Sequence, residues 1–136
     1  MGVHLRTNQF IYEVGSKDFL ISFFDTIEIR LARSWFGKKY PTILNEFYNG
    51  KLTVKNLEKA EKELKDIRER LKKFEPSKVV WDKTDLSKQP PWGDDISSDI
   101  TDLSNYFVTS DGEDLFEVLF EAIGKAKEEN SELIIE

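Results

Sequence analysis

The stretch LEKAEKELKDIRERLKKF, residues 57–74, is the most regular element of the sequence. Its apolar residues alternate at spacings of three and four, which places them on one narrow face of an α-helix. This seam consists of Leu57, Ala60, Leu64, Ile67, Leu71 and Phe74. It covers fewer than three heptads, too few for an independent coiled coil. The sequence therefore predicts a surface helix that Thr53 caps, that Pro76 ends and that packs on the rest of the domain.

Upstream of this helix, the sequence predicts two short strands and a longer helix. Residues 3–5 and 10–14 have the apolar composition of strands. Residues 17–34 then carry a broad apolar face at helical spacing, with Ser16 as a suitable N-cap and Gly37 as a suitable residue just beyond the end. This part of the chain is thus expected to form a strand pair followed by a helix.

Two isoleucines do not fit the apolar face of this first helix. Ile21 and Ile29 fall on its opposite side, beside acidic residues. We expect them to be partly exposed, although a second element could also cover that side. After this helix, residues 41–48 predict a short second helix, with Pro41 in its first turn.

Downstream of the seam helix, strands alternate with irregular sequence and one last helix. Residues 78–81 and 106–109 have strand composition, and residues 133–135 form a short final apolar run. Between them, Ser110 and Glu113 have the spacing of a capping box for a helix that ends near Glu128.

These elements together predict an α+β fold. A sheet must bury its apolar side, so we expect a small mixed or antiparallel sheet of three to five short strands, with helices packed mainly on one face. A chain of 136 residues is long enough to bury one core. Residues 1–136 are therefore predicted to form a single domain.

Composition limits the compartment and the chemistry. The chain has no cysteine, which excludes disulfide frameworks and zinc–thiolate sites. No apolar run approaches the roughly 18 residues of a spanning helix, and the N-terminus lacks the order of a signal peptide. We therefore expect a cytoplasmic protein that has no membrane partner.

Charge is distributed unevenly along the chain. Residues 1–81 have a net charge of +5, residues 82–121 of −9, and the last fifteen of −2. A field of this kind influences the choice of partner and the rate of association more than the fold. Because phosphate neutralisation needs Lys and Arg, the acidic part is not expected to bind nucleic acid.

The sequence offers little that could carry catalysis. His4 is the single histidine and lies in a predicted strand, without a recognisable nucleophile or orienting partner. The glycines are isolated, and no acidic run matches the EF-hand pattern. We therefore predict no cofactor, no metal and no enzymatic activity. A small enzyme that uses carboxylates and Mg²⁺ remains the least favoured alternative.

The most distinctive feature is an irregular stretch, residues 82–102, which we call the acidic loop. Its candidate partner-binding residues are Asp82, Asp85, Trp92, Asp94, Asp95, Asp99 and Asp102. One interpretation is a solvated loop whose tryptophan fills the core. The other is an interaction surface, in which the tryptophan is a buried anchor and the aspartates steer a basic partner. Irregular stretches of this length in compact domains are usually functional or disordered.

Three segments of this region also resemble a known family. They are KVVWD at residues 78–82, DLSKQPPWGD at residues 85–94 and SNYFVTSDG at residues 104–112. Together with the Phe23–Phe24 pair and the charged helix before Pro76, they resemble the Immunity protein 70 family of bacterial polymorphic toxin systems. The resemblance implies a cytoplasmic antidote that binds a cognate toxin domain and blocks it stoichiometrically. It implies no residue roles.

Two other functions stay open at this point. One is a different acidic protein-binding or oligomerisation module, which would use the seam or the pair Ile21 and Ile29. The other is the carboxylate enzyme. The oligomeric state is not predicted.

Overall fold

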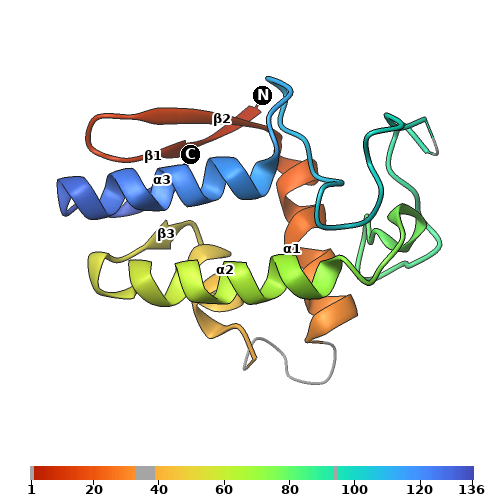
Figure 1. Ribbon diagram of the computed structural model, residues 1–136, viewed down its shortest axis with the longest axis horizontal. Helices are drawn as coiled ribbons and strands as arrows, with labels where there is room; N and C mark the ends of the chain where they lie inside the picture. The colour runs from red at the N-terminus through yellow and green to blue at the C-terminus, as the bar shows by residue number, and fades with distance from the viewer. Residues whose placement is uncertain (1, 33–38, 94) are drawn as a thin grey trace.

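The computed structural model describes residues 2–32, 39–93 and 95–136 (Figure 1). Its sheet has four antiparallel strands in the order β2-β1-β4-β3. The strands are β1 (Gly2–Arg6), β2 (Ile11–Ser16), β3 (Lys51–Leu52) and β4 (Leu133–Ile135). The predicted α+β class is confirmed, and the sheet is antiparallel rather than mixed.

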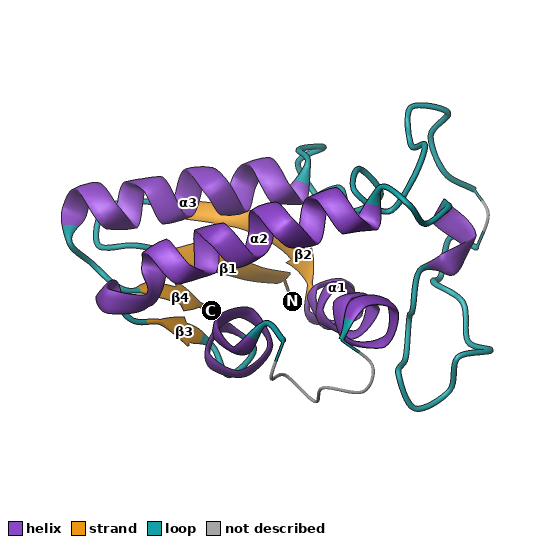
Figure 2. Ribbon diagram, turned by 60° about the horizontal axis from the view of Figure 1, so that its bottom comes forward, coloured by secondary structure: helices purple, strands orange, loops and turns teal. Residues whose placement is uncertain are grey.

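The two faces of the sheet differ because successive residues of a strand point to opposite sides. Leu5, Val14 and Leu133 are fully buried on the side that the helices cover. On the other side, His4 of β1 pairs with Glu13 of β2 at 2.7 Å. Figure 2 shows α2 (Leu57–Leu71) and α3 (Leu115–Glu129) lying over one face of the strands, as predicted.

The seam faces this core. The five seam residues within α2 are at most 1% exposed, and Phe74 packs against the same cluster. The helix starts later than predicted, since a 3₁₀ turn (Val54–Asn56) precedes Leu57. Thr53 does not cap with its side chain, because its hydroxyl donates to Glu46 Oε1 at 2.7 Å.

Helix α1 (Lys17–Leu31) begins as predicted, with the Ser16 hydroxyl accepting the N–H of Phe19 at 3.0 Å. Its predicted end at residue 34, and Gly37 beyond it, lie outside the described residues. Ile21 and Ile29 are partly buried.

The side of α1 that turns away from the sheet is also covered. Ser22, Asp25 and Thr26 are all buried there. Val80 bonds to Ser22 and Thr26, and Lys83 bonds to Asp25. A second segment therefore packs on this side, while Ile21 and Ile29 stay partly exposed, as expected.

The capping box predicted for α3 is wrong. Asp114, not Ser110, is the N-cap, and its Oδ1 accepts the N–H of Phe116 at 2.8 Å. The Ser110 hydroxyl instead donates to Glu13 Oε1 at 3.2 Å. The helix ends at Glu129, and Asn130 follows in the left-handed conformation (φ 53°), which asparagine adopts more readily than most residues.

The short helix predicted at residues 41–48 is present as a π-helical segment, Thr42–Phe47. Glu63 of α2 binds its start, since its carboxylate accepts the N–H of Thr42 at 3.2 Å and of Ile43 at 2.9 Å. Strand β3 follows directly and was not predicted, because two residues give no readable alternation.

Two predicted strands are not formed. Lys78 ends a 3₁₀ turn (Pro76–Lys78), and residues 79–81 are irregular, because the backbone of Val80 bonds to side chains of α1 rather than to a neighbouring strand. Residues 106–109 make only an isolated bridge, between Val108 and Asp114. Both segments have the residue types of strands, but neither pairs with one of the four strands of the sheet.

Replacement of Leu64 by alanine tests whether the seam carries the core. Leu64 is fully buried, so we expect the variant to lose about 2–5 kcal/mol in the free energy of unfolding. The exposed neighbour Lys62 provides the control, and Lys62→Ala should change stability by less than about 0.5 kcal/mol. Denaturant unfolding measures both. Equal stabilities of the two variants would contradict the packing described here.

Candidate functional site

The acidic loop begins at a hydrogen-bonded attachment to α1. The hydroxyl of Thr26 accepts the N–H of Val80 at 3.0 Å, and the hydroxyls of Ser22 and Thr26 donate to the Val80 carbonyl at 2.6 and 3.2 Å. All three residues are buried. Buried backbone N–H and C=O groups need hydrogen-bond partners. At Val80 the hydroxyls of Ser22 and Thr26 provide these partners, which a neighbouring strand would otherwise provide.

A second contact with α1 lies three residues further on. The backbone N–H of Lys83 donates to Asp25 Oδ2 at 3.3 Å, and its ammonium group lies 3.2 Å from Glu28. Burial raises the pKa of the Asp25 carboxyl, although Lys83 opposes the rise. In Figure 1 the loop extends from here, on the far side of α1 from the sheet. The loop therefore starts from a fixed position on the helix.

Three of the predicted partner-binding aspartates shape the loop itself. Asp82, Asp85 and Asp102 each accept the N–H and the hydroxyl of the residue two positions on, at 2.5–3.1 Å. Such Asx turns give an irregular segment its own hydrogen bonds. Those bonds also lower the pKa values of Asp82 and Asp85, because they stabilise the charged carboxylates.

The remaining aspartates are less engaged. Asp95 and Asp99 are exposed, and neither pairs with a cation among the described residues. Asp94 lies outside the described residues. Both lysines of the loop are already paired, Lys83 with Glu28 and Lys88 with Asp82 at 3.5 Å. The loop thus presents carboxylates to solvent while its own cations are neutralised.

Trp92 fits neither of the two simple interpretations. Its side chain is 37% exposed, so it does not simply fill the core. Its position is nevertheless fixed, because its indole N–H donates to the Tyr106 hydroxyl at 2.8 Å and its ring meets Trp81 edge-on at 5.5 Å between centroids. Tyr106 in turn contacts Phe107 in the core at 5.2 Å. Trp92 is therefore a partly exposed residue whose orientation is fixed by its contacts with Tyr106 and Trp81.

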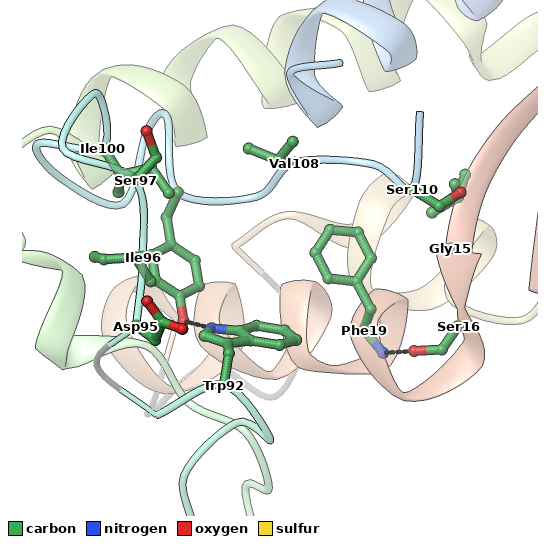
Figure 3. Close-up of a pocket in the computed structure, with 12 residues that line it drawn as sticks. Gly15, Ser16, Phe19, Trp92, Asp95, Ile96, Ser97, Ile100, Val108 and Ser110 are labelled. Atoms are coloured by element: carbon green, nitrogen blue, oxygen red, sulfur yellow. Dashed lines mark hydrogen bonds between the residues drawn. The ribbon is translucent and has the colours of Figure 1, made fainter. Parts of the chain in front are cut away.

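Beside Trp92 lies a groove of about 410 Å³ between the loop and the junction of β2 with α1. Figure 3 shows the rings of Trp92 and Phe19 on two sides of this space, with Val108 over it and Ile96 and Ile100 on the loop side. Val108 is 40% exposed. The acidic loop therefore does not stand alone; it forms one wall of an apolar groove.

Of the predicted site residues that the structure describes, only Trp92 and Asp95 line the groove. The other walls come from Phe19 and Val108, which sequence reasoning did not select. Phe19 belongs to the apolar pattern of α1 and gave no separate signal. Val108 could have been found, since it lies in the segment SNYFVTSDG that carries the family resemblance.

Comparison with known proteins supplies the missing context for this site. The family model for Immunity protein 70 matches residues 5–135. The chain belongs to the Immunity protein 70 family. No curated protein and no solved structure matches the chain.

Two further observations bear on this member of the Immunity protein 70 family. Within the described ranges, no three Asp, Glu or His side chains come together in a way that could hold a metal ion. None of the described helices is long and apolar enough to cross a membrane.

The attachment of the loop to α1 can be tested with Thr26→Val. Valine keeps the shape of threonine but leaves the buried N–H of Val80 without a partner, which costs about 1–3 kcal/mol in the free energy of unfolding. Ser22→Ala is the matched control, because Thr26 still donates to the Val80 carbonyl in that variant. Unfolding by denaturant and amide exchange at Val80 and Lys83 provide the readouts. A control as destabilised as Thr26→Val would show that the N–H contact is not decisive.

Proposed function

We propose that this protein is an immunity protein that binds a cognate toxin domain in the cytoplasm and neutralises it stoichiometrically, without catalysis. The family match over residues 5–135 is the observation that carries this proposal. In this proposal, residues 1–136 act as one domain, and the inhibitor protects the producing cell by covering the toxin.

The charge distribution supports a basic partner. Residues 82–121 have a net charge of −9, and the acidic loop projects to one side of the molecule (Figure 1). The loop lysines are paired, whereas Asp95 and Asp99 remain available. Complementary charge accelerates encounter and suppresses wrong partners.

The form of the loop supports binding through a prepared surface. Its Asx turns, its attachment at Val80 and the Trp92–Tyr106 hydrogen bond all hold it in place before any partner arrives. A surface that is already ordered loses less conformational entropy on association. We assign partner binding to Asp82, Asp85, Trp92, Asp94, Asp95, Asp99 and Asp102, with Asp82, Asp85 and Asp102 contributing mainly through loop shape.

The alternative of an oligomerisation module is weakened by the position of its proposed interface. The seam residues of α2 are buried within the fold, so they are not available to a second copy. Ile21 and Ile29 are partly buried rather than exposed.

His4, the only candidate for general acid–base catalysis by histidine, pairs with Glu13 across β1 and β2.

The role of loop charge can be tested by replacing Asp94, Asp95 and Asp99 together with asparagine. If these residues steer a basic toxin domain, the association rate should fall by about tenfold at low salt, and it should depend less on salt than in the wild type. Stopped-flow kinetics or surface plasmon resonance with the purified cognate toxin domain measures both. The melting temperature should stay nearly unchanged, since exposed charges contribute little to stability.

A matched control removes the same number of charges elsewhere. Glu69, Glu128 and Glu132 are exposed and lie on α2, on α3 and before β4. Their joint replacement by glutamine should leave the salt dependence close to the wild type. Equal effects of the two triple variants would mean that total charge, rather than the acidic loop, governs association.

A further inference from the structure

The groove beside Trp92 is built from three separate parts of the chain. Its lining residues come from the junction of β2 and α1, from the acidic loop and from the segment before α3, with Phe19, Trp92 and Val108 as apolar contributors from the three parts. Its walls are tied together, because the N–H of Ser110 donates to the Val14 carbonyl at 3.0 Å and Trp92 donates to Tyr106 at 2.8 Å. The groove is therefore held open by hydrogen bonds rather than formed by a loose loop.

The size and lining of the groove suit one large apolar side chain. Its volume of about 410 Å³ lies in the range of typical ligand pockets, about 300–1,000 Å³. Trp92 and Val108 leave 37% and 40% of their surface exposed there. Gly15 also lines the groove, and its φ of +144° is a conformation that residues with side chains rarely adopt. Burial of an aromatic or aliphatic group in this space would remove apolar surface from water on both partners.

The edge of the groove is acidic. Asp95 is part of the wall, and the exposed Asp99 and Asp111 directly adjoin the lining residues Ile100 and Ser110 in the chain. None of the twelve described lining residues is Lys or Arg. The chemistry of the edge thus favours cationic groups around the apolar occupant.

We infer that this groove receives a single apolar side chain, aromatic or long aliphatic, from a basic segment of the toxin domain. This inference rests on the proposed function, and it names the part of the partner that the inhibitor recognises. The apolar side chain would fill the space between Trp92, Phe19 and Val108, while neighbouring Lys or Arg residues meet Asp95 and Asp99. A large side chain in a well-packed, desolvated pocket is the usual arrangement of a binding hot spot.

Val108→Arg tests the inference directly. Arginine at this position would occupy the groove and repel a basic segment, so affinity for the toxin domain should fall by about tenfold or more, mainly through faster dissociation. Val54→Arg is the matched control, because Val54 is 38% exposed, close to the 40% of Val108, and lies before α2 outside the groove. It should change affinity by less than about twofold. Wild-type affinity in Val108→Arg would overturn the inference.

A second pair of variants guards against misfolding of Val108→Arg. Ser97 lines the groove, whereas its exposed neighbour Ser98 does not. Ser97→Lys should weaken binding while Ser98→Lys does not, with both melting temperatures near the wild type. Equal affinities of this pair would count against the groove as the binding surface.

A peptide probe separates failure of this inference from failure of the proposed function. The peptides Lys-Arg-Phe-Arg-Lys and Lys-Arg-Ser-Arg-Lys carry the same charge and differ in the apolar side chain. The first should shift the amide resonances of Gly15, Ser97 and Ser110 more than the second, even if the toxin domain itself does not bind. Binding of the toxin domain together with equal shifts from both peptides would overturn the groove inference and leave the proposed function standing.

Discussion

The packing of aromatic rings around Phe23 joins the parts of this molecule that lie far apart in the sequence. Phe23 is fully buried, and its ring lies 5.2 Å from that of Phe107 and 5.4 Å from that of Phe116, centroid to centroid. One residue of α1 thereby contacts both α3 and the segment that leads into it. Because protein interiors are close-packed, these three parts must fit together before the surface above them can be defined.

The candidate site is connected to this core through side-chain contacts. Contacts run from Phe23 through Phe107 and Tyr106 to Trp92, where the series reaches the surface. Helix α1 contributes on two sides, since one side faces the sheet and the other binds Val80 through Ser22 and Thr26. An irregular loop of this length would be expected to be mobile if it lacked such contacts. Here the core fixes both its start and its tryptophan.

The aspartates of the loop illustrate how one residue type can serve two purposes. Asp82, Asp85 and Asp102 bind backbone N–H groups and so replace the hydrogen bonds that a strand or helix would provide. Asp95 and Asp99 remain at the surface, where their charge extends toward a partner. The net charge of the loop does not reveal this division. The local sequence does not reveal it either, because Ser97 and Thr101 follow Asp95 and Asp99 at the same spacing as Thr84, Ser87 and Ser104 follow the other three.

The sequence by itself determined the α+β class, the buried face of α2, the N-cap of α1, the irregular acidic loop and the family. Each of these depends on local periodicity, on composition or on short motifs, which neighbouring residues specify. Tertiary structure alone decided that residues 78–81 bind α1 instead of joining the sheet, that Asp114 rather than Ser110 caps α3, and that Phe19, Trp92 and Val108 line one groove. These three residues are distant in the chain, and nothing in local sequence encodes their meeting. Their arrangement follows from how the helices and the loop pack on one core, which is a property of the whole chain.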